Sequence, residues 1–267
     1  MAKAKATPAA KNLPTTRAAT TVGHALDYAA DAGAGFEGAG REAFAIPFLG
    51  VLQSMSPQCK KSDGAYIKGA EEGMLFNTVT NEVFDGSEGV EIIPCAFTQT
   101  FVEWATRESG GGFIAEYDAV SGTALRGNCK RDDKNRDILP NGHQLNDHRN
   151  HYVLFKDADG NWQPALMSLS STQIKASRNW MSAMQRICTT QGVPMFALHY
   201  QLTTVPQQND KGSWYGVQFA HIGLVDDEEA YSAAKAFYTQ AKTGGVKTSP
   251  RETPEAGATS TDDPDDM

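Results

Sequence analysis

Short stretches in which apolar and polar residues alternate recur along most of the chain and predict a protein made mainly of β-strands. The β-branched and aromatic residues that favour strands are concentrated in the same stretches. Between two of them, the residues from Asp157 to Asn161 form a strong hairpin signal. The predicted strands cover residues 44–52, 74–80, 82–84, 89–107, 113–117, 151–156, 162–169, 195–205 and 214–225.

Two segments change to the spacing of a helix. Ser170 and Gln173 form a capping-box pattern, and the following apolar residues Ile174, Met181, Met184 and Cys188 lie on one helical face. A second helix is expected from Asp226 to about Ala241. Since strands predominate, we predict the α+β class, with mainly antiparallel strands arranged as an OB-like barrel or a sheet with two helices.

The composition divides the chain into three parts. Residues 1–40 are predicted to be a disordered basic arm, with a short helix near residues 24–32, and residues 41–241 a single globular domain. Within that domain, the polar stretch 127–150 is expected to be a long mobile loop without regular structure. Residues 242–267 are predicted to be a disordered acidic tail, because they contain too few large apolar residues to offset the entropy of ordering.

Charge and hydropathy limit the classes of function. The formal net charge is −8, with +4 in residues 1–17 and −9 in residues 18–241, so a cationic surface would have to be local. No apolar run approaches the length of about 20 residues that spans a bilayer, and no secretory signal is recognisable. We therefore expect a protein that binds no membrane and stays in the cytoplasm of the host cell. Its four cysteines are widely spaced, which is typical of reduced thiols.

Motifs for catalysis are missing from the sequence. Gly110-Gly111-Gly112 lacks the residues that would make it a phosphate-binding loop, and a hairpin turn is the simpler interpretation. His143, His148 and His151 lie near Cys129, but their spacing is not that of a zinc site, so we interpret them as solvated histidines. We expect neither an enzyme nor a bound metal or cofactor.

Binding of single-stranded nucleic acid needs only aromatic rings for stacking and cations along the backbone path. Several residues could serve, although Trp104 and Trp214 are individually more typical of core residues, and Lys175 and Arg178 could belong to the solvated face of an amphipathic helix. The candidates are Phe101, Trp104, Arg107, Trp162, Lys175, Arg178, Lys211, Trp214 and Tyr215.

Three segments together resemble a family of tailed-phage proteins from early or replication regions of the genome. They are residues 66–80, 101–112 and 168–180, and the resemblance extends over about residues 44–225. It implies an accessory role in DNA replication, similar to that of phage single-stranded-DNA-binding proteins. The family offers no catalytic residues to carry over.

The C-terminus supports the same interpretation, because a flexible tether that ends in a block of like charge is typical of an interaction tail. Asp262, Asp263, Asp265, Asp266 and Met267 are the residues expected to bind replication or host proteins. The first hypothesis is a phage single-stranded-DNA-binding protein that supports replication or recombination. The alternative is a non-enzymatic accessory protein that binds and redirects a host protein through this tail and the 127–150 loop. Self-association of the chain is left open.

Overall fold

The computed structural model describes residues 46–106, 110–209 and 212–243. Most strands belong to one antiparallel sheet with the order β11-β10-β4-β8-β7-β6, in which β5 also pairs with β4, and β9 with β8. A small second sheet has the order β1-β2-β3. The strands are β1 (Leu49–Val51), β2 (Leu75–Asn77), β3 (Val83–Phe84), β4 (Val90–Trp104), β5 (Phe113–Asp118), β6 (Lys130–Arg131), β7 (Asp137–Ile138), β8 (Gln144–Lys156), β9 (Trp162–Ser170), β10 (Leu198–Asn209) and β11 (Gly212–Leu224). The α-helices are α1 (Ala119–Arg126), α2 (Ile174–Gln191) and α3 (Glu228–Lys242).

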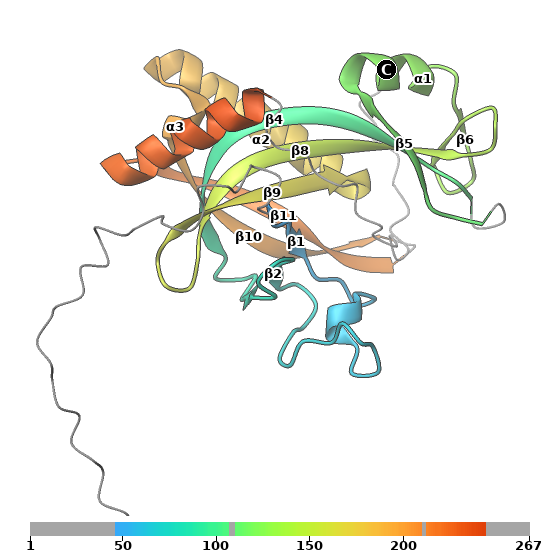
Figure 1. Ribbon diagram of the computed structural model, residues 1–267, viewed down its shortest axis with the longest axis horizontal. Coiled ribbons are helices and arrows are strands. Elements are labelled where there is room, and N and C mark those ends of the chain that lie inside the picture. The colour runs from blue at the N-terminus through green and yellow to red at the C-terminus, as the bar shows by residue number, and fades with distance from the viewer. Residues whose placement is uncertain (1–45, 107–109, 210–211, 244–267) are drawn as a thin grey trace, which may run out of the picture. The chain divides into compact units, whose positions relative to one another are not determined.

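Strands β4 and β8 form a long curved ribbon that carries the rest of the sheet (Figure 1). One half of the ribbon is extended by β10 and β9, and the other half by β5 and β7. The register of β4 shifts between Pro94 and Ala96, where a bulge accommodates the proline and bends the strand. The ribbon therefore joins a main half-barrel to a smaller region made of β5, α1, β6, β7 and the adjoining ends of β4 and β8, which we call the distal lobe.

The residues that flank β1 connect the two outer strands of the half-barrel, β9 and β11. Phe48 forms an isolated bridge with Leu166 of β9. On the other side, the Gln53 side chain donates to the Tyr215 carbonyl at 2.9 Å and accepts from the Tyr215 amide at 2.9 Å. The Gln53 side-chain amide thus bonds the backbone groups of β11 to which a neighbouring strand would otherwise form hydrogen bonds.

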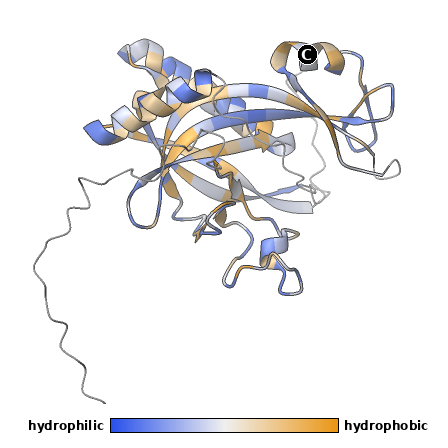
Figure 2. Cartoon of the chain, in the orientation of Figure 1, coloured by the Kyte–Doolittle hydropathy of each residue, from blue (hydrophilic) through white to orange (hydrophobic). Residues whose placement is uncertain are grey.

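Two apolar clusters hold helices on opposite faces of the sheet. On the inner face, Trp180 and Met184 of α2 pack with buried residues such as Phe155 and Leu202. On the outer face, Ala230, Ala234 and Phe237 of α3 pack with buried residues of β4, β8 and β9. In Figure 2 the loop between β8 and β9 is hydrophilic, while hydrophobic colours lie along the strands that these helices cover. Burial of these two faces fixes the position of α2 and therefore of its polar side.

The fold confirms the predicted α+β class with mainly antiparallel strands, and the curled half-barrel is consistent with an OB-like fold. The described part of the chain has three α-helices rather than two, because α1 was not predicted. The expected capping box is wrong in detail: a 3-10 turn precedes α2, and neither Ser170 nor Gln173 makes a side-chain capping bond. Helix α3 does begin as expected, with the Asp227 side chain accepting from the amides of Glu229 and Ala230.

The stretch 127–150 is not a loop without regular structure, as the sequence suggested. It contains β6, β7 and the first half of β8, and Arg131 of β6 pairs with Asp137 of β7. The predicted arm, residues 1–40, with its short helix, lies outside the described residues, as does the tail beyond residue 243.

Candidate nucleic-acid interface

Helix α2 presents a cationic side to solvent. Its apolar residues face the inner core, so Lys175, Arg178 and Arg186 lie on the opposite, exposed side. Their spacing of three and then eight residues keeps them on one stripe of the helix. The eighteen residues of α2 include no Asp or Glu. The helix therefore carries three basic residues on one side and no acid in its own sequence.

The absence of acids extends well beyond this helix. Strands β9, β10 and β11 also contain no Asp or Glu. Over the whole run from residue 160 to residue 225 there are four Lys and Arg residues and one acid, so the run carries +3 in a chain of net charge −8. Because α2 contacts both β9 and β11, the acid-poor segments are neighbours in space as well as in sequence. This is the local cationic surface that an acidic nucleic-acid-binding protein requires.

Aromatic residues adjoin this surface at the hairpin of β10 and β11. Trp214 and Tyr215 are partly buried, and they stand opposite Gln207 and Pro206 in the pairing of the two strands. The indole Nε1 of Trp214 donates to Gln207 Oε1 at 2.8 Å, which orients the ring. Lys175, Arg178 and Tyr215 thus belong to one acid-poor set of elements, which we call the α2–β11 surface. Tyr215 lies on the same face of β11 as Phe219, which stacks on α2, whereas Trp214 points to the opposite face of the sheet.

The other predicted rings lie elsewhere. Phe101 is only 2% exposed, in the core of the distal lobe, so its assignment as a stacking residue is wrong: a base could reach it only if the lobe unfolded. Trp104 is partly buried and makes an edge contact with Phe113, at 6.1 Å between ring centroids. Phe113 is itself 42% exposed, and sequence analysis missed it as a stacking candidate.

Trp162 lies on the outer face of the sheet, packed against the cluster that holds α3. Its ring contacts His199, and the Lys156 ammonium lies 5.6 Å from the ring centroid. Glu91 lies within 3.3 Å of that ammonium, so this position is not acid-free. Trp162 therefore belongs to a different surface from α2. Arg107, Lys211 and the predicted tail residues Asp262, Asp263, Asp265, Asp266 and Met267 lie outside the described residues.

Sequence analysis also missed Arg186, although it lies on the same helical stripe as Lys175 and Arg178. The long acid-free run could have revealed Arg186. A segment of this length that contains basic residues but no acid is conspicuous in an acidic chain.

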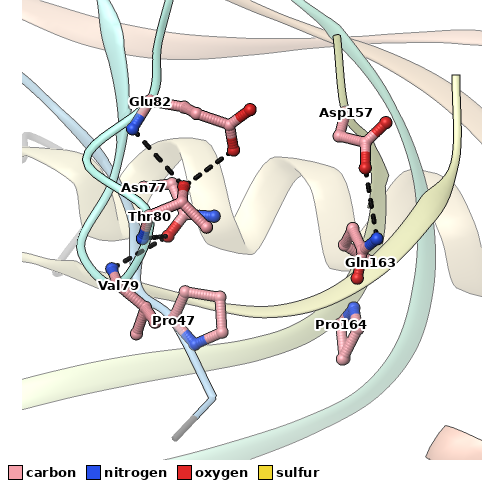
Figure 3. A pocket seen from close by; sticks show the side chains of 8 residues that line it. All are labelled: Pro47, Asn77, Val79, Thr80, Glu82, Asp157, Gln163 and Pro164. Carbon is pink, nitrogen blue, oxygen red and sulfur yellow. Dashed lines mark hydrogen bonds between the residues drawn. The ribbon is translucent and has the colours of Figure 1, made fainter. Parts of the chain in front are cut away.

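A cleft of about 490 Å³ lies between the β2–β3 turn and the β8–β9 hairpin (Figure 3). Glu82 and Asp157 stand on its two sides, and Pro47, Val79 and Pro164 provide apolar lining. The Glu82 carboxylate accepts from Thr80 Oγ1, and Asp157 from the Gln163 amide. With two carboxylates and no basic residue in its lining, this cleft is unsuited to a phosphate chain.

The three histidines that the sequence grouped together lie in separate environments. His143 contacts the buried Glu103 through Nδ1, at 2.5 Å, and His148 contacts Ser168 at 3.0 Å. Burial opposes ionisation of Glu103, but hydrogen bonds from Tyr117, Asn141 and His143 outweigh it and lower the pKa of this carboxyl. His151 is 1% exposed, between Phe97 and Trp180, and its Nε2 lies 2.8 Å from Ser177 Oγ. Among the described residues, no group of three or more potential metal ligands comes together.

His151 leads to a prediction about stability. Burial, with a smaller effect of Arg149, lowers its pKa to about 3, so the folded protein holds the ring neutral while the unfolded chain protonates it at its ordinary pKa near 6.5. The unfolded state therefore binds more protons, and the free energy of unfolding should fall by about 1.4 kcal/mol per pH unit as the pH drops below about 6.5. Denaturant titrations at several pH values measure this slope.

The variant His151→Gln is the control for this prediction. It should lower stability at neutral pH but flatten the slope between about pH 6.5 and 5, since glutamine does not titrate. His148 contributes with the same sign, because burial also lowers its pKa. An unchanged slope in the variant would contradict the assignment to His151.

Together these observations define a class of protein: an α+β protein with a curled antiparallel half-barrel, whose inner-face helix presents a cationic stripe. A protein-family model described as Pam3 phage gp34-like protein matches residues 15–247. The chain belongs to this family, which confirms the expected assignment to a family of phage proteins. The family description names no activity and gives no likeness to single-stranded-DNA-binding proteins. No curated protein and no solved structure matches the chain significantly. None of the described helices is long and apolar enough to cross a membrane.

Proposed function

We propose that this phage protein binds single-stranded DNA during replication or recombination, and that the α2–β11 surface is where the strand lies. The observation that carries the proposal is the acid-free stretch of β9, α2, β10 and β11 with its cationic stripe. Lys175, Arg178 and Arg186 supply contacts to phosphates, and Tyr215 supplies a ring for a base. Such contacts need no sequence motif, since each stacked base contributes about 1–3 kcal/mol whatever its identity.

The binding energy in this proposal is largely electrostatic. Each phosphate that a cation contacts releases condensed counterions, and for single strands this lowers the logarithm of the association constant by about 0.7 per contact for each tenfold increase in salt. Three contacts on α2 account for a slope of about 2. The remaining affinity would come from stacking, which depends little on salt.

A fluorescence-anisotropy titration of a labelled oligothymidine tests the proposal at two salt concentrations. Binding is expected at low salt, with a slope of at least about 2 in the double-logarithmic plot. A duplex of the same length is the control, since its bases are not available for stacking on Tyr215. Lack of detectable binding to the single strand at low salt contradicts the proposal.

One observation favours the second candidate, an accessory protein that binds and redirects a host protein. In the distal lobe, Phe113, Ile114 and Val120 are exposed large apolar residues close together in the chain, at the start of β5 and of α1. Apolar side chains exposed in a group are typical of protein-binding surfaces. If the protein shows no affinity for DNA in the titration, these apolar residues of the distal lobe become the site to test for binding of a host protein.

A further inference from the structure

In the distal lobe, one carboxylate holds two guanidinium groups together. Asp137 of β7 lies 2.8 Å from Nε of Arg126, in the last turn of α1, and 3.5 Å from Nε of Arg131, on β6. Two positive charges thus meet one negative charge. An isolated surface ion pair is neutral and contributes little, but this trio keeps a net positive charge in a fixed place.

Each of the two guanidinium groups contacts Asp137 through one edge, and both remain accessible to solvent. Their side chains are 33% and 47% exposed, and each approaches Asp137 through Nε. Arg131 also donates from one terminal nitrogen to Asn135 Oδ1 at 2.8 Å. A guanidinium has five N–H donors in a rigid plane, so donors remain on each arginine after these contacts. Arginines oriented in this way are suited to phosphate oxygens, because little side-chain entropy is lost on binding.

This trio is connected to the α2–β11 surface along one face of the ribbon. Arg126 also approaches Asp147 of β8 at 4.0 Å, and Asp147 accepts two hydrogen bonds from Arg149. Arg149 stands opposite Gln99 of β4, and the next pair on the same face is Phe97 with His151. His151 in turn contacts Ser177 of α2. A row of three arginines and two aspartates therefore leads from the hairpin of β6 and β7 along the inner face of the ribbon to the side of α2 that packs on the sheet, from which the cationic stripe lies across the helix.

We infer that Arg126 and Arg131 form a second phosphate-binding site, which takes a backbone phosphodiester of the same DNA strand that lies on α2. The inference rests on the proposed function and extends it, because it assigns the distal lobe a part in binding. A strand long enough to follow the ribbon contacts both sites, whereas a short oligonucleotide reaches one. Affinity should therefore increase with length beyond what the α2–β11 surface alone provides.

Arg131→Gln is the test variant, since Arg131 is exposed and its loss leaves Asp137 paired with Arg126. Arg136→Gln is the matched control: Arg136 lies in the same hairpin, is 45% exposed, and binds Asp132 as a pair without a second guanidinium among the described contacts. Arg126→Gln is a second test variant, with thermal melts to verify that it folds. Each protein is titrated with oligothymidines of about 6 and about 25 nucleotides, lengths near the lower end of the range of site sizes in OB folds and above it.

Arg131→Gln and Arg126→Gln are each expected to weaken binding of the long strand by about threefold to tenfold and to lower its salt slope by about 0.7, as loss of one phosphate contact requires. Binding of the short strand and the behaviour of Arg136→Gln should match the unmodified protein. If Arg131→Gln weakens long-strand binding no more than Arg136→Gln does, the second site is excluded while the proposed function stands. If the unmodified protein binds neither strand, the proposed function itself fails.

Discussion

Reversing the charge of the α2 stripe should abolish most of the affinity for single-stranded DNA. In the variant with Lys175, Arg178 and Arg186 all replaced by Glu, three attractive contacts are lost and three repulsive ones appear. We expect the affinity at about 0.1 M salt to fall by about 100-fold or more, and the salt slope to decrease by about 2. The anisotropy titration used for the unmodified protein measures both quantities.

The fold should tolerate this change. The three side chains lie on the exposed side of α2, away from the inner cluster that contains Trp180 and Met184. Glutamate is a good helix former, and at positions 175 and 178 it lies near the helix N-terminus, where negative charge is favoured. At position 186 the dipole effect is slightly unfavourable. A melting temperature within a few degrees of the unmodified protein is therefore expected.

The control for this experiment carries the same change in net charge at other positions. Lys61, Lys68 and Lys235 are exposed and lie outside α2 and its neighbouring strands, so their replacement by Glu changes the charge of the molecule equally. This control should lose affinity only modestly, through the general field of the protein. If both triple variants lose the same affinity, α2 has no special part in binding and the α2–β11 surface is not the interface.

Sequence reasoning located the strands of the main half-barrel because their apolar alternation was strong. It failed for α1, which is short and has an unusual distribution of residues: Val120 is 82% exposed, while Gly122 is buried. A Cβ at Gly122 would lie 2.1 Å from the Phe101 ring, so close packing requires glycine at the centre of this helix. Glycine lowers helix propensity, and the requirement for it comes from a residue 21 positions away. No local pattern could reveal that.

Strands β6 and β7 of the distal lobe were missed for a related reason. These short strands carry charged side chains such as Arg131 and Asp137, so the hydrophobic alternation that identifies strands is absent. The error over Phe101 has the same origin, because strand parity places Phe101 and Trp104 on opposite faces but cannot say which face a later segment will cover. In contrast, the polar side of α2 could be predicted, because helical spacing alone separates Lys175 and Arg178 from the apolar residues.

Trp180→Ala should cause the largest loss of stability among single substitutions in α2. The indole is 3% exposed and stacks on Phe219 of β11, with 3.8 Å between ring centroids and 5° between planes. It also contacts His151 of β8 and Tyr200 of β10, so it joins the helix to three strands. Truncation of a buried tryptophan to alanine typically costs about 3–5 kcal/mol, a large part of the roughly 5–15 kcal/mol that stabilises a domain.

This loss should be visible as a decrease in melting temperature of about 6–20 °C, from about 2–4 °C per kcal/mol for a domain of this size. Trp180→Phe keeps an aromatic ring against Phe219 and should recover part of the stability. Trp214→Ala is the matched control, since that tryptophan is only partly buried, and it should lower stability much less. Because α2 must stay docked to present its cations, Trp180→Ala should lower the melting temperature and the DNA affinity together. A cost below about 1 kcal/mol would mean that Trp180 does not anchor the helix, and the fixed position of the cationic stripe would lose its structural basis.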